Sequence, residues 1–424
     1  MKKFTIAALA ICLAFALATP VMAVDADFTG AYRVRGVFVD KSDMDKGTAN
    51  DAYMDMRLRL QTVFKVTDIL SLTTRIDAFD NSKWGEAANT GSVTKGNDID
   101  LDRVYMTIKA PIGKFDIGRQ AGGTFGTLFR DTDTDVDRIK YTKVIDGLTI
   151  MAIFEKATEK DSTTSTDNGD QDKDIYHIAP TYKMENITAG ALASFTNDKG
   201  NDIATTRTYC LTPYFVGKFG PVNIQGEASY LWGTIDYDNA ATTDKDYKAL
   251  AYNLEASFNF GPANIMAGYA FASGEDTDVN DLTASGGVGN DWEKLFILTT
   301  NEVSSLINLG GAGNLSKDGI VKATAAIGND PGAKIIYGGA SFSPLDNLKL
   351  GVVVGKAYAD EVPAGYEDDY GIEYDLTLNW KIYDNLTYSA VAAFLSSGDL
   401  WKGGVAGAEV EDVYALFHQL ELKF

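Results

Sequence analysis

The C-terminal segment Glu411–Phe424 constrains the fold of this chain most strongly. Its apolar residues share one parity: Tyr414, Leu416, Leu420, Leu422 and Phe424. The opposite parity holds Gln419, Glu421 and Lys423. An alternation with a period of two predicts a strand with one apolar and one polar face. Soluble proteins rarely end on a buried aromatic residue in this way, so the pattern favours a terminal strand whose apolar face meets lipid.

The N-terminus has the features of a secretory signal peptide. Lys2 and Lys3 precede the apolar run Ile6–Ala18, and Val21–Ala23 supplies a cleavage site with a small residue. We therefore predict that residues 1–23 are removed. The run is too short to span a bilayer stably. Cleavage would leave Cys210 as the remaining cysteine, which excludes an intramolecular disulfide.

The composition of the chain agrees with a β-barrel in a membrane. No later segment approaches the ~20 uninterrupted apolar residues of a membrane helix. The mean hydropathy is −0.12. A membrane barrel has such a value because polar residues that face the lumen dilute every strand. The net charge of −21 argues against nucleic acid as a partner.

Alternating segments recur along the chain, for example at 54–65, 222–232, 250–260 and 372–380. Each has about the 9–11 residues that a tilted strand needs to cross a bilayer. A soluble all-β sandwich also alternates, but it would need neither the signal peptide nor the terminal Phe424.

The connections between these segments are alternately short and long. The short ones are rich in Gly, Pro, Asn and Asp, as tight turns require. They fall near Thr67–Leu70, Pro111–Gly113, Ile145–Gly147, Met184–Asn186, Phe219–Pro221, Gly261–Pro262, Pro344–Asn347 and Tyr383–Asn385. Short periplasmic turns and long extracellular loops are typical of outer-membrane barrels. Eight turns predict an all-β, antiparallel transmembrane β-barrel of about 18 strands, with 16 as the alternative, that fills residues 24–424 as one domain.

The predicted mature chain resembles a Gram-negative outer-membrane porin. Phe115–Gln120 (FDIGRQ), a Gly-rich stretch and Asp137–Tyr141 (DRIKY) are similar to barrels of the alginate-export and substrate-specific porin type. The resemblance implies a basic lumen, an outer-membrane location, contacts with lipid and lipopolysaccharide, and recognition of Phe424 by the barrel-assembly machinery. General porins are homotrimers, whereas large substrate-specific barrels are often monomers, so both assemblies stay open.

Arginine is concentrated in the first third of the chain: of ten arginines, all but Arg207 fall by residue 138. Strand parity predicts these basic pore-lining residues: Arg33, Arg35, Arg57, Arg59, Arg75, Arg103, Arg138, Lys109 and Lys140. An opposed acidic wall is predicted from Glu227, Glu255, Glu373 and Asp375. The basic wall would attract anions. Alternatively, Asp55, Asp77 and Asp116 would neutralise it, and the two walls would only orient solutes.

The connection at 273–332 is the longest by far. Its apolar patches, Leu295–Leu298 and Val303–Leu309, predict that it packs inside the barrel as a constriction. The alternative is an extracellular cap. The loop at 122–135, with Phe125, Leu128 and Phe129, is a second candidate for narrowing the pore.

Catalytic and metal chemistry have little support in the sequence. His177 and His418 are the only histidines, and neither belongs to a Ser/His constellation. Asp131, Asp133 and Asp135 begin like a calcium loop, but Val136 and Thr142 stand where an EF-hand needs Gly and Glu. We predict no enzyme, no cofactor and no metal site.

The sequence therefore predicts an outer-membrane porin for passive diffusion of small hydrophilic solutes, with anions as one candidate class. A specific channel for a carboxylate, or an export channel for an anionic polymer, is the alternative. A structural or adhesive barrel with a plugged lumen is the third.

Overall fold

The computed structural model describes residues 24–47, 49–85, 99–132, 134–160, 171–199, 204–238, 242–276, 281–301, 315–316, 330–405 and 407–424. The predicted signal peptide, the second apolar patch at Val303–Leu309 and Asp133 lie outside these residues. Among the described residues, no helix is long and apolar enough to span a membrane.

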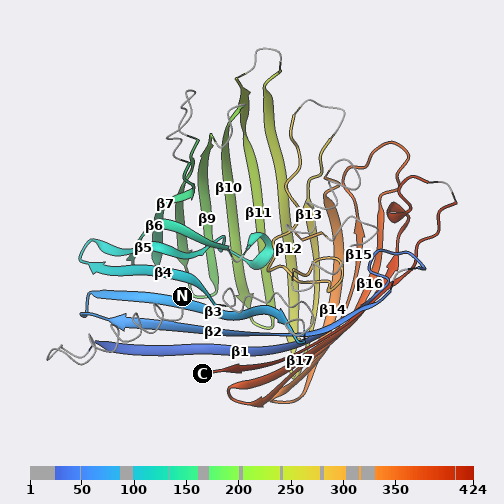
Figure 1. Ribbon diagram of the computed structural model, residues 1–424, viewed down its shortest axis with the longest axis horizontal. Helices are drawn as coiled ribbons and strands as arrows, with labels where there is room; N and C mark the ends of the chain where they lie inside the picture. Colours follow the sequence, from blue (N-terminus) through green and yellow to red (C-terminus); the bar gives the residue numbers. More distant parts are fainter. Residues whose placement is uncertain are drawn as a thin grey trace.

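The described strands form one closed antiparallel barrel of 18 strands, which confirms 18 rather than 16 (Figure 1). They are β1 (Asp25–Asp40), β2 (Asp51–Lys65), β3 (Leu70–Lys83), β4 (Ile99–Ala110), β5 (Gly113–Gly122), β6 (Thr134–Ile145), β7 (Leu148–Thr158), β8 (Lys173–Lys183), β9 (Ile187–Asp198), β10 (Ala204–Phe219), β11 (Val222–Tyr237), β12 (Lys245–Phe260), β13 (Ala263–Ala272), β14 (Ala333–Leu345), β15 (Leu348–Tyr358), β16 (Asp369–Tyr383), β17 (Leu386–Ser397) and β18 (Val413–Lys423). Each strand pairs with its chain neighbours, and β1 also pairs with β18. Closure satisfies the backbone groups that an open sheet edge would expose to lipid.

The C-terminal residue forms part of the seam between β1 and β18. The backbone N–H of Gly30 donates to the carbonyl of Phe424 at 2.8 Å, and the N–H of Phe424 donates to the carbonyl of Gly30 at 3.0 Å. A Cβ on Gly30 would lie 2.5 Å from Cζ of Phe424, so the ring needs glycine beneath it. The terminal residue therefore adds a further rung to the closing ladder.

Alternation along the strands places apolar side chains outside and polar ones inside. In β16, Tyr374 and Leu376 are exposed on the outer surface, whereas Glu373 and Asp375 are buried on the inner face. An outer surface that meets lipid favours this arrangement. The eight predicted short connections all join neighbouring strands. At one of them, Asp146 and Gly147 have φ of 45° and 85°, as a two-residue hairpin turn requires.

Two of the long connections fold into the barrel. We call them the β5–β6 loop (residues 123–132), which contains the short helix η1 (Leu128–Arg130), and the β13–β14 loop (residues 281–301). In Figure 1, η1 lies near β11, where Thr127 just before this helix donates a hydrogen bond to Glu227. A second short helix, η3 (Asp399–Lys402), lies between β17 and β18.

Candidate functional site

Arginine side chains of β1 and β2 form forked ion pairs on the inner face. Nε and Nη2 of Arg35 donate to Oδ1 and Oδ2 of Asp55 at 2.8 and 2.7 Å, and both side chains are buried. Nε and Nη2 of Arg59 donate in the same way to Asp77, at 2.8 and 2.6 Å. A planar guanidinium matches the two oxygens of a carboxylate. These pairs therefore neutralise much of the predicted basic wall.

A shared network continues this pairing onto β3, β4 and β6. Nη2 of Arg75 donates to Asp102 and to Asp135, each at 2.7 Å. Nε of Arg103 donates to the other oxygen of Asp135 at 2.5 Å. Since Asp135 belongs to β6, the network ties three strands together on the inner face.

Two aspartates that face the arginines, Asp80 and Asp102, lie at irregularities in the backbone of β3 and β4. The β2–β3 register shifts between Met56 and Leu58, where Phe79 has a φ of 57°, and Asp80 follows in this stretch. The β3–β4 register shifts beside Arg75, and Asp102 lies there. A bulge re-aims side chains relative to strict alternation. Parity alone therefore could not place Asp80 or Asp102 on the inner face.

Arg33 and Arg57 share a looser partner. The side chain of Asp80 lies 4.0 Å from the guanidinium of Arg33 and 3.6 Å from that of Arg57. The Asp80 side chain is 41% exposed, so water screens both contacts.

Positive charge is less compensated on β6. Arg138 Nη2 donates to the carbonyl of Ala121, and among the described residues no carboxylate forms an ion pair with Arg138. Nζ of Lys140 lies 3.5 Å from Asp116, which Lys114 approaches more closely, at 2.8 Å. Lys109 is exposed near the periplasmic end of β4 and has no ion-pair partner within the described ranges.

The predicted acidic residues of β11 and β12 contact the inward loops. Oε2 of Glu227 accepts hydrogen bonds from N and Oγ1 of Thr127 in the β5–β6 loop, both at 2.7 Å. Oε2 of Glu255 accepts from Nζ of Lys294 in the β13–β14 loop at 2.6 Å, and from the hydroxyl of Tyr337 at 2.8 Å.

The acidic pair of β16 holds the β13–β14 loop by its backbone. The oxygens of Glu373 accept from N–H of Ile297 at 2.5 Å and of Leu298 at 2.9 Å. Oδ2 of Asp375 accepts from N–H of Phe296 at 3.0 Å. Glu373 is 0% exposed and Asp375 is 3% exposed. Both carboxyl groups thus lie beneath the loop and form its docking site on β16.

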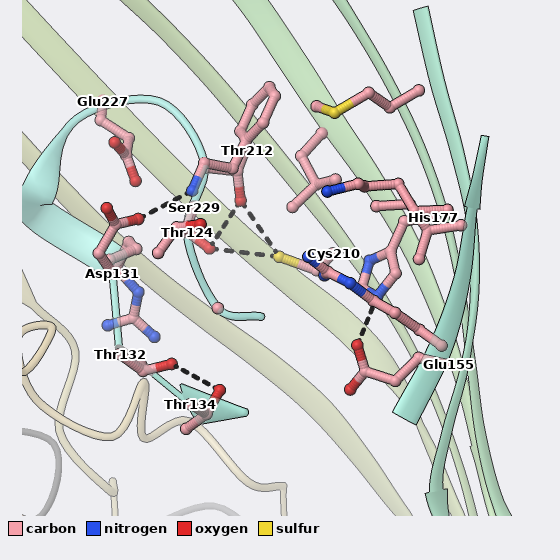
Figure 2. A pocket seen from close by; sticks show the side chains of 18 of the residues that line it. Thr124, Asp131, Thr132, Thr134, Glu155, His177, Cys210, Thr212, Glu227 and Ser229 are labelled. Atoms are coloured by element: carbon pink, nitrogen blue, oxygen red, sulfur yellow. Dashed lines mark hydrogen bonds and ion pairs between the residues drawn. The ribbon is translucent and has the colours of Figure 1, made fainter. Parts of the chain in front are cut away.

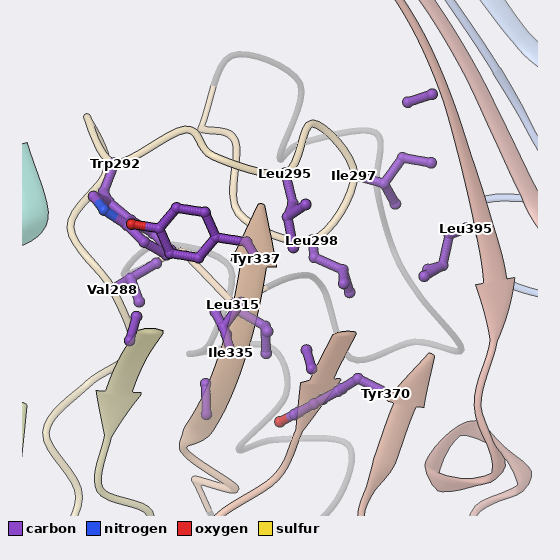
Figure 3. Packing of buried hydrophobic residues seen from close by; sticks show 14 of the residues in the cluster. Val288, Trp292, Leu295, Ile297, Leu298, Leu315, Ile335, Tyr337, Tyr370 and Leu395 are labelled. Atoms are coloured by element: carbon purple, nitrogen blue, oxygen red, sulfur yellow. The ribbon is translucent and has the colours of Figure 1, made fainter. Parts of the chain in front are cut away.

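Apolar packing also holds the β13–β14 loop at this docking site (Figure 3). Leu295, Ile297 and Leu298 are fully buried in one cluster with Leu395 of β17. A Cβ on Gly355 of β15 would lie 2.6 Å from Cδ1 of Leu295, so the leucine fits a gap that glycine leaves. Full burial of each aliphatic side chain stabilises the docked loop by about 1.5–3 kcal/mol.

The two inward loops also contact each other. N–H of Gly289 donates to the carbonyl of Phe129 at 2.8 Å, and the rings of Phe129 and Trp292 meet edge-on at 5.7 Å. Arg130 donates to the carbonyls of Gly287 and Ser285 at 2.5 and 3.0 Å. Burial lowers the pKa of Arg130. The loops therefore form one continuous body inside the barrel.

A buried carboxyl lies at the end of the long connection. Asp330 Oδ1 accepts from N–H of Gly332 at 2.8 Å, and its backbone carbonyl accepts from N–H of Glu275 at 2.7 Å. Burial raises the pKa of Asp330 to about 6.

The β5–β6 loop borders a half-open cavity of about 470 Å³ on the inner face of β6 to β11 (Figure 2). Arg138, Lys140, His177, Cys210 and Glu227 are among its lining residues. Within the described residues, no three His, Cys, Asp or Glu side chains are grouped to hold a metal ion.

Comparison with known proteins identifies the family. The Gram-negative porin model matches residues 6–298, which is more than half of the chain. No curated protein sequence matches. Among solved structures, Pseudomonas aeruginosa OccK8 (OprE) is 12% identical with a TM-score of 0.54, over 94% of this chain and 98% of that one. A BenF-like porin from Pseudomonas fluorescens Pf-5 is 12% identical with a TM-score of 0.53, over 94% and 99%.

The chain therefore belongs to the Gram-negative porin family. It is an outer-membrane β-barrel that forms a channel for small solutes. The low identity of the solved structures supports the fold alone. The family and the fold point to a channel rather than an enzyme.

Proposed function

We propose that this porin passes small hydrophilic solutes by passive diffusion, without a dedicated substrate and without catalysis. The observation that carries the proposal is the pairing of the inner-face arginines with aspartates. Arg35, Arg59 and Arg75 each have a carboxylate partner within 2.8 Å. A paired wall presents alternating charge rather than a net positive field, which favours orientation of dipolar solutes over strong selection of anions.

We further propose that the two inward loops narrow the passage, and that the more exposed members of the predicted set, such as Arg57 and Lys109, line it. The docking of the β13–β14 loop onto Glu373 and Asp375 supports a fixed constriction. Contacts with lipopolysaccharide, recognition of Phe424 by the assembly machinery and a homotrimer stay predictions from the sequence.

A channel selective for an anion or carboxylate is the second candidate. Arg138 favours it, because among the described residues this guanidinium lacks a carboxylate partner in ion-pair contact. A plugged barrel is the third.

Reversal potentials and liposome swelling distinguish these candidates. In a KCl gradient we expect a weak ion preference, together with swelling in neutral sugars at rates that fall with sugar size. A strong anion preference with no sugar flux would support the selective channel instead. If the protein showed no conductance and no swelling, only the plugged barrel would remain.

A further inference from the structure

The cavity behind the β5–β6 loop is a side chamber of the barrel. The loop leaves β5 and reaches β11, where Thr127 hydrogen bonds to Glu227. On the way, the ring of Phe125 packs edge-on against Tyr214 of β10 at 5.1 Å. The cavity is lined by this loop and by β6 to β11, and none of its lining residues belongs to β1 or β2. A solute inside it would be held off the main passage.

Opposite charges stand on the two sides of this chamber. Arg138 and Lys140 project from β6, whereas Glu227 projects from β11. Arg138 Nε and Glu227 Oε1 are both buried and have no hydrogen-bond partner. Glu227 is only 3% exposed, and its other oxygen, Oε2, accepts the two hydrogen bonds from Thr127. Burying polar atoms without partners is costly. Because both atoms are shielded from the chamber, a solute reaches them only when the two side chains turn towards it.

Apolar side chains form part of the lining between these charges, alongside polar residues that include His177, Thr212 and Ser229. Met151 and Ile153 of β7, Leu192 of β9 and Leu231 of β11 line the cavity. Its basic and acidic lining residues balance, with Arg130, Arg138 and Lys140 against Asp131, Glu155 and Glu227. A balanced, charge-separated chamber favours a dipolar solute over a simple anion.

We propose that this chamber binds an amino acid with an apolar side chain, the carboxylate towards Arg138 and Lys140 and the ammonium towards Glu227. The apolar body lies against Met151 and Ile153. The volume of about 470 Å³ falls in the range of small-molecule sites. The inference rests on the proposed function, because the solute must first enter the barrel.

Cys210 provides a direct reporter of occupancy. Its Sγ lies in the chamber, 3.2 Å from Oγ of Ser229 and 3.5 Å from Oγ1 of Thr212. It is the single cysteine of the chain outside the predicted signal peptide. A small methanethiosulfonate should therefore label this position alone in reconstituted protein.

The test measures the rate of Cys210 labelling in proteoliposomes with and without L-leucine. We expect leucine to slow labelling about tenfold at a concentration about ten times its Kd. Two matched analogues serve as controls: 4-methylpentanoate, which lacks the ammonium, and 3-methylbutylamine, which lacks the carboxylate. At the same concentration neither should protect. Equal protection by 4-methylpentanoate would overturn the dipolar site in favour of an anion site.

Variants assign the effect to the chamber. Arg138→Gln should abolish protection by leucine, whereas Arg119→Gln should retain it, because Arg119 is exposed and pairs with Asp137. Unchanged protection in Arg138→Gln would overturn the proposal, provided that the variant forms the barrel on a heat-modifiability gel. Single-channel conductance, recorded from the same samples, distinguishes failure of the proposed amino-acid site from failure of the proposed channel function. A conducting porin without leucine protection overturns the chamber alone, and loss of conductance overturns the proposed function.

Discussion

At the scale of single residues, charge compensation decides what the inner face can do. Arg35 and Asp55 are both buried, and two hydrogen bonds between them satisfy both oxygens of the aspartate. Arg57 instead shares the partly exposed Asp80 with Arg33. The sequence places both arginines on the same face, but the structure gives them different roles. The first stiffens the wall, and we propose that the second meets solutes.

Replacing these two arginines should have different consequences. Arg35→Gln leaves Asp55 buried without a partner, a loss that typically costs about 3–5 kcal/mol. We expect a clear fall in the urea midpoint of the refolded barrel. Arg57→Gln breaks only a screened contact, worth about 0–1 kcal/mol, and should leave the midpoint unchanged. It should instead shift the reversal potential in a KCl gradient towards cations. Equal midpoints for the two variants would contradict this assignment.

Asp330 should make the docking of the long connection depend on pH. Burial raises its pKa from 3.8 to about 6, so the folded loop binds a proton more tightly than the unfolded chain does. The resulting stabilisation is fully present below about pH 4 and is lost as the pH rises through about 6. We expect slower proteolytic cleavage of the loop at pH 5 than at pH 7.5. Asp330→Asn should reduce that difference, and an unchanged pH response in this variant would rule Asp330 out as its source.

At the scale of elements, the inward loops explain why acidic residues are placed opposite the arginines. Glu227, Glu255, Glu373 and Asp375 each hydrogen bond to one of the two loops. The strands supply carboxylates, and the loops supply N–H groups, the hydroxyl of Thr127 and the ammonium of Lys294. Loop position is thereby fixed from several strands at once.

The hydrogen bonds from the β13–β14 loop to Glu373 and Asp375 of β16 can be tested directly. The double variant Glu373→Ala, Asp375→Ala removes three hydrogen bonds from loop N–H groups, each worth about 0.5–1.5 kcal/mol. We expect the β13–β14 loop to become sensitive to protease while the barrel stays folded. Thr377→Ala, at the next inner-facing position of β16, is the matched control and should change neither property. A loop that stays resistant in the double variant would show that apolar packing alone holds it.

Sequence periodicity predicted the strands and turns because lipid on one side and water on the other impose alternation on every strand. It placed the eight short connections and the strand number. It could not place Asp80 and Asp102, because register shifts there break the alternation. It also could not pair Glu373 with the loop amides, since those residues lie more than 70 positions apart in the chain.

At the scale of the whole molecule, closure depends on the seam between β1 and β18. Ten registered pairs join these strands, and Phe424 adds hydrogen bonds to Gly30 beyond them. The β13–β14 loop also packs against the seam from inside, where the ring of Phe296 lies 5.4 Å from that of Phe417 on β18.

Deleting Phe424 should therefore slow closure. The variant loses the last backbone pair with Gly30 and the ring that covers it. We expect a smaller heat-modifiable fraction and more protein left in the periplasm. Phe424→Tyr, which keeps the backbone pair and the ring, is the control and should assemble normally. Normal assembly of the deletion variant would show that the remaining seam is sufficient.

The central claim is that this barrel is a passive channel narrowed by its inward loops. Single-channel conductance in planar bilayers tests it most directly, with the wild-type protein compared with a variant in which a short Gly–Ser linker replaces residues 276–317. We predict discrete conductance steps for the wild type and steps severalfold larger for the variant, which should still be heat-modifiable. Equal conductance of the two proteins would place the β13–β14 loop outside the conducting path, and an absence of steps in both would contradict the channel itself.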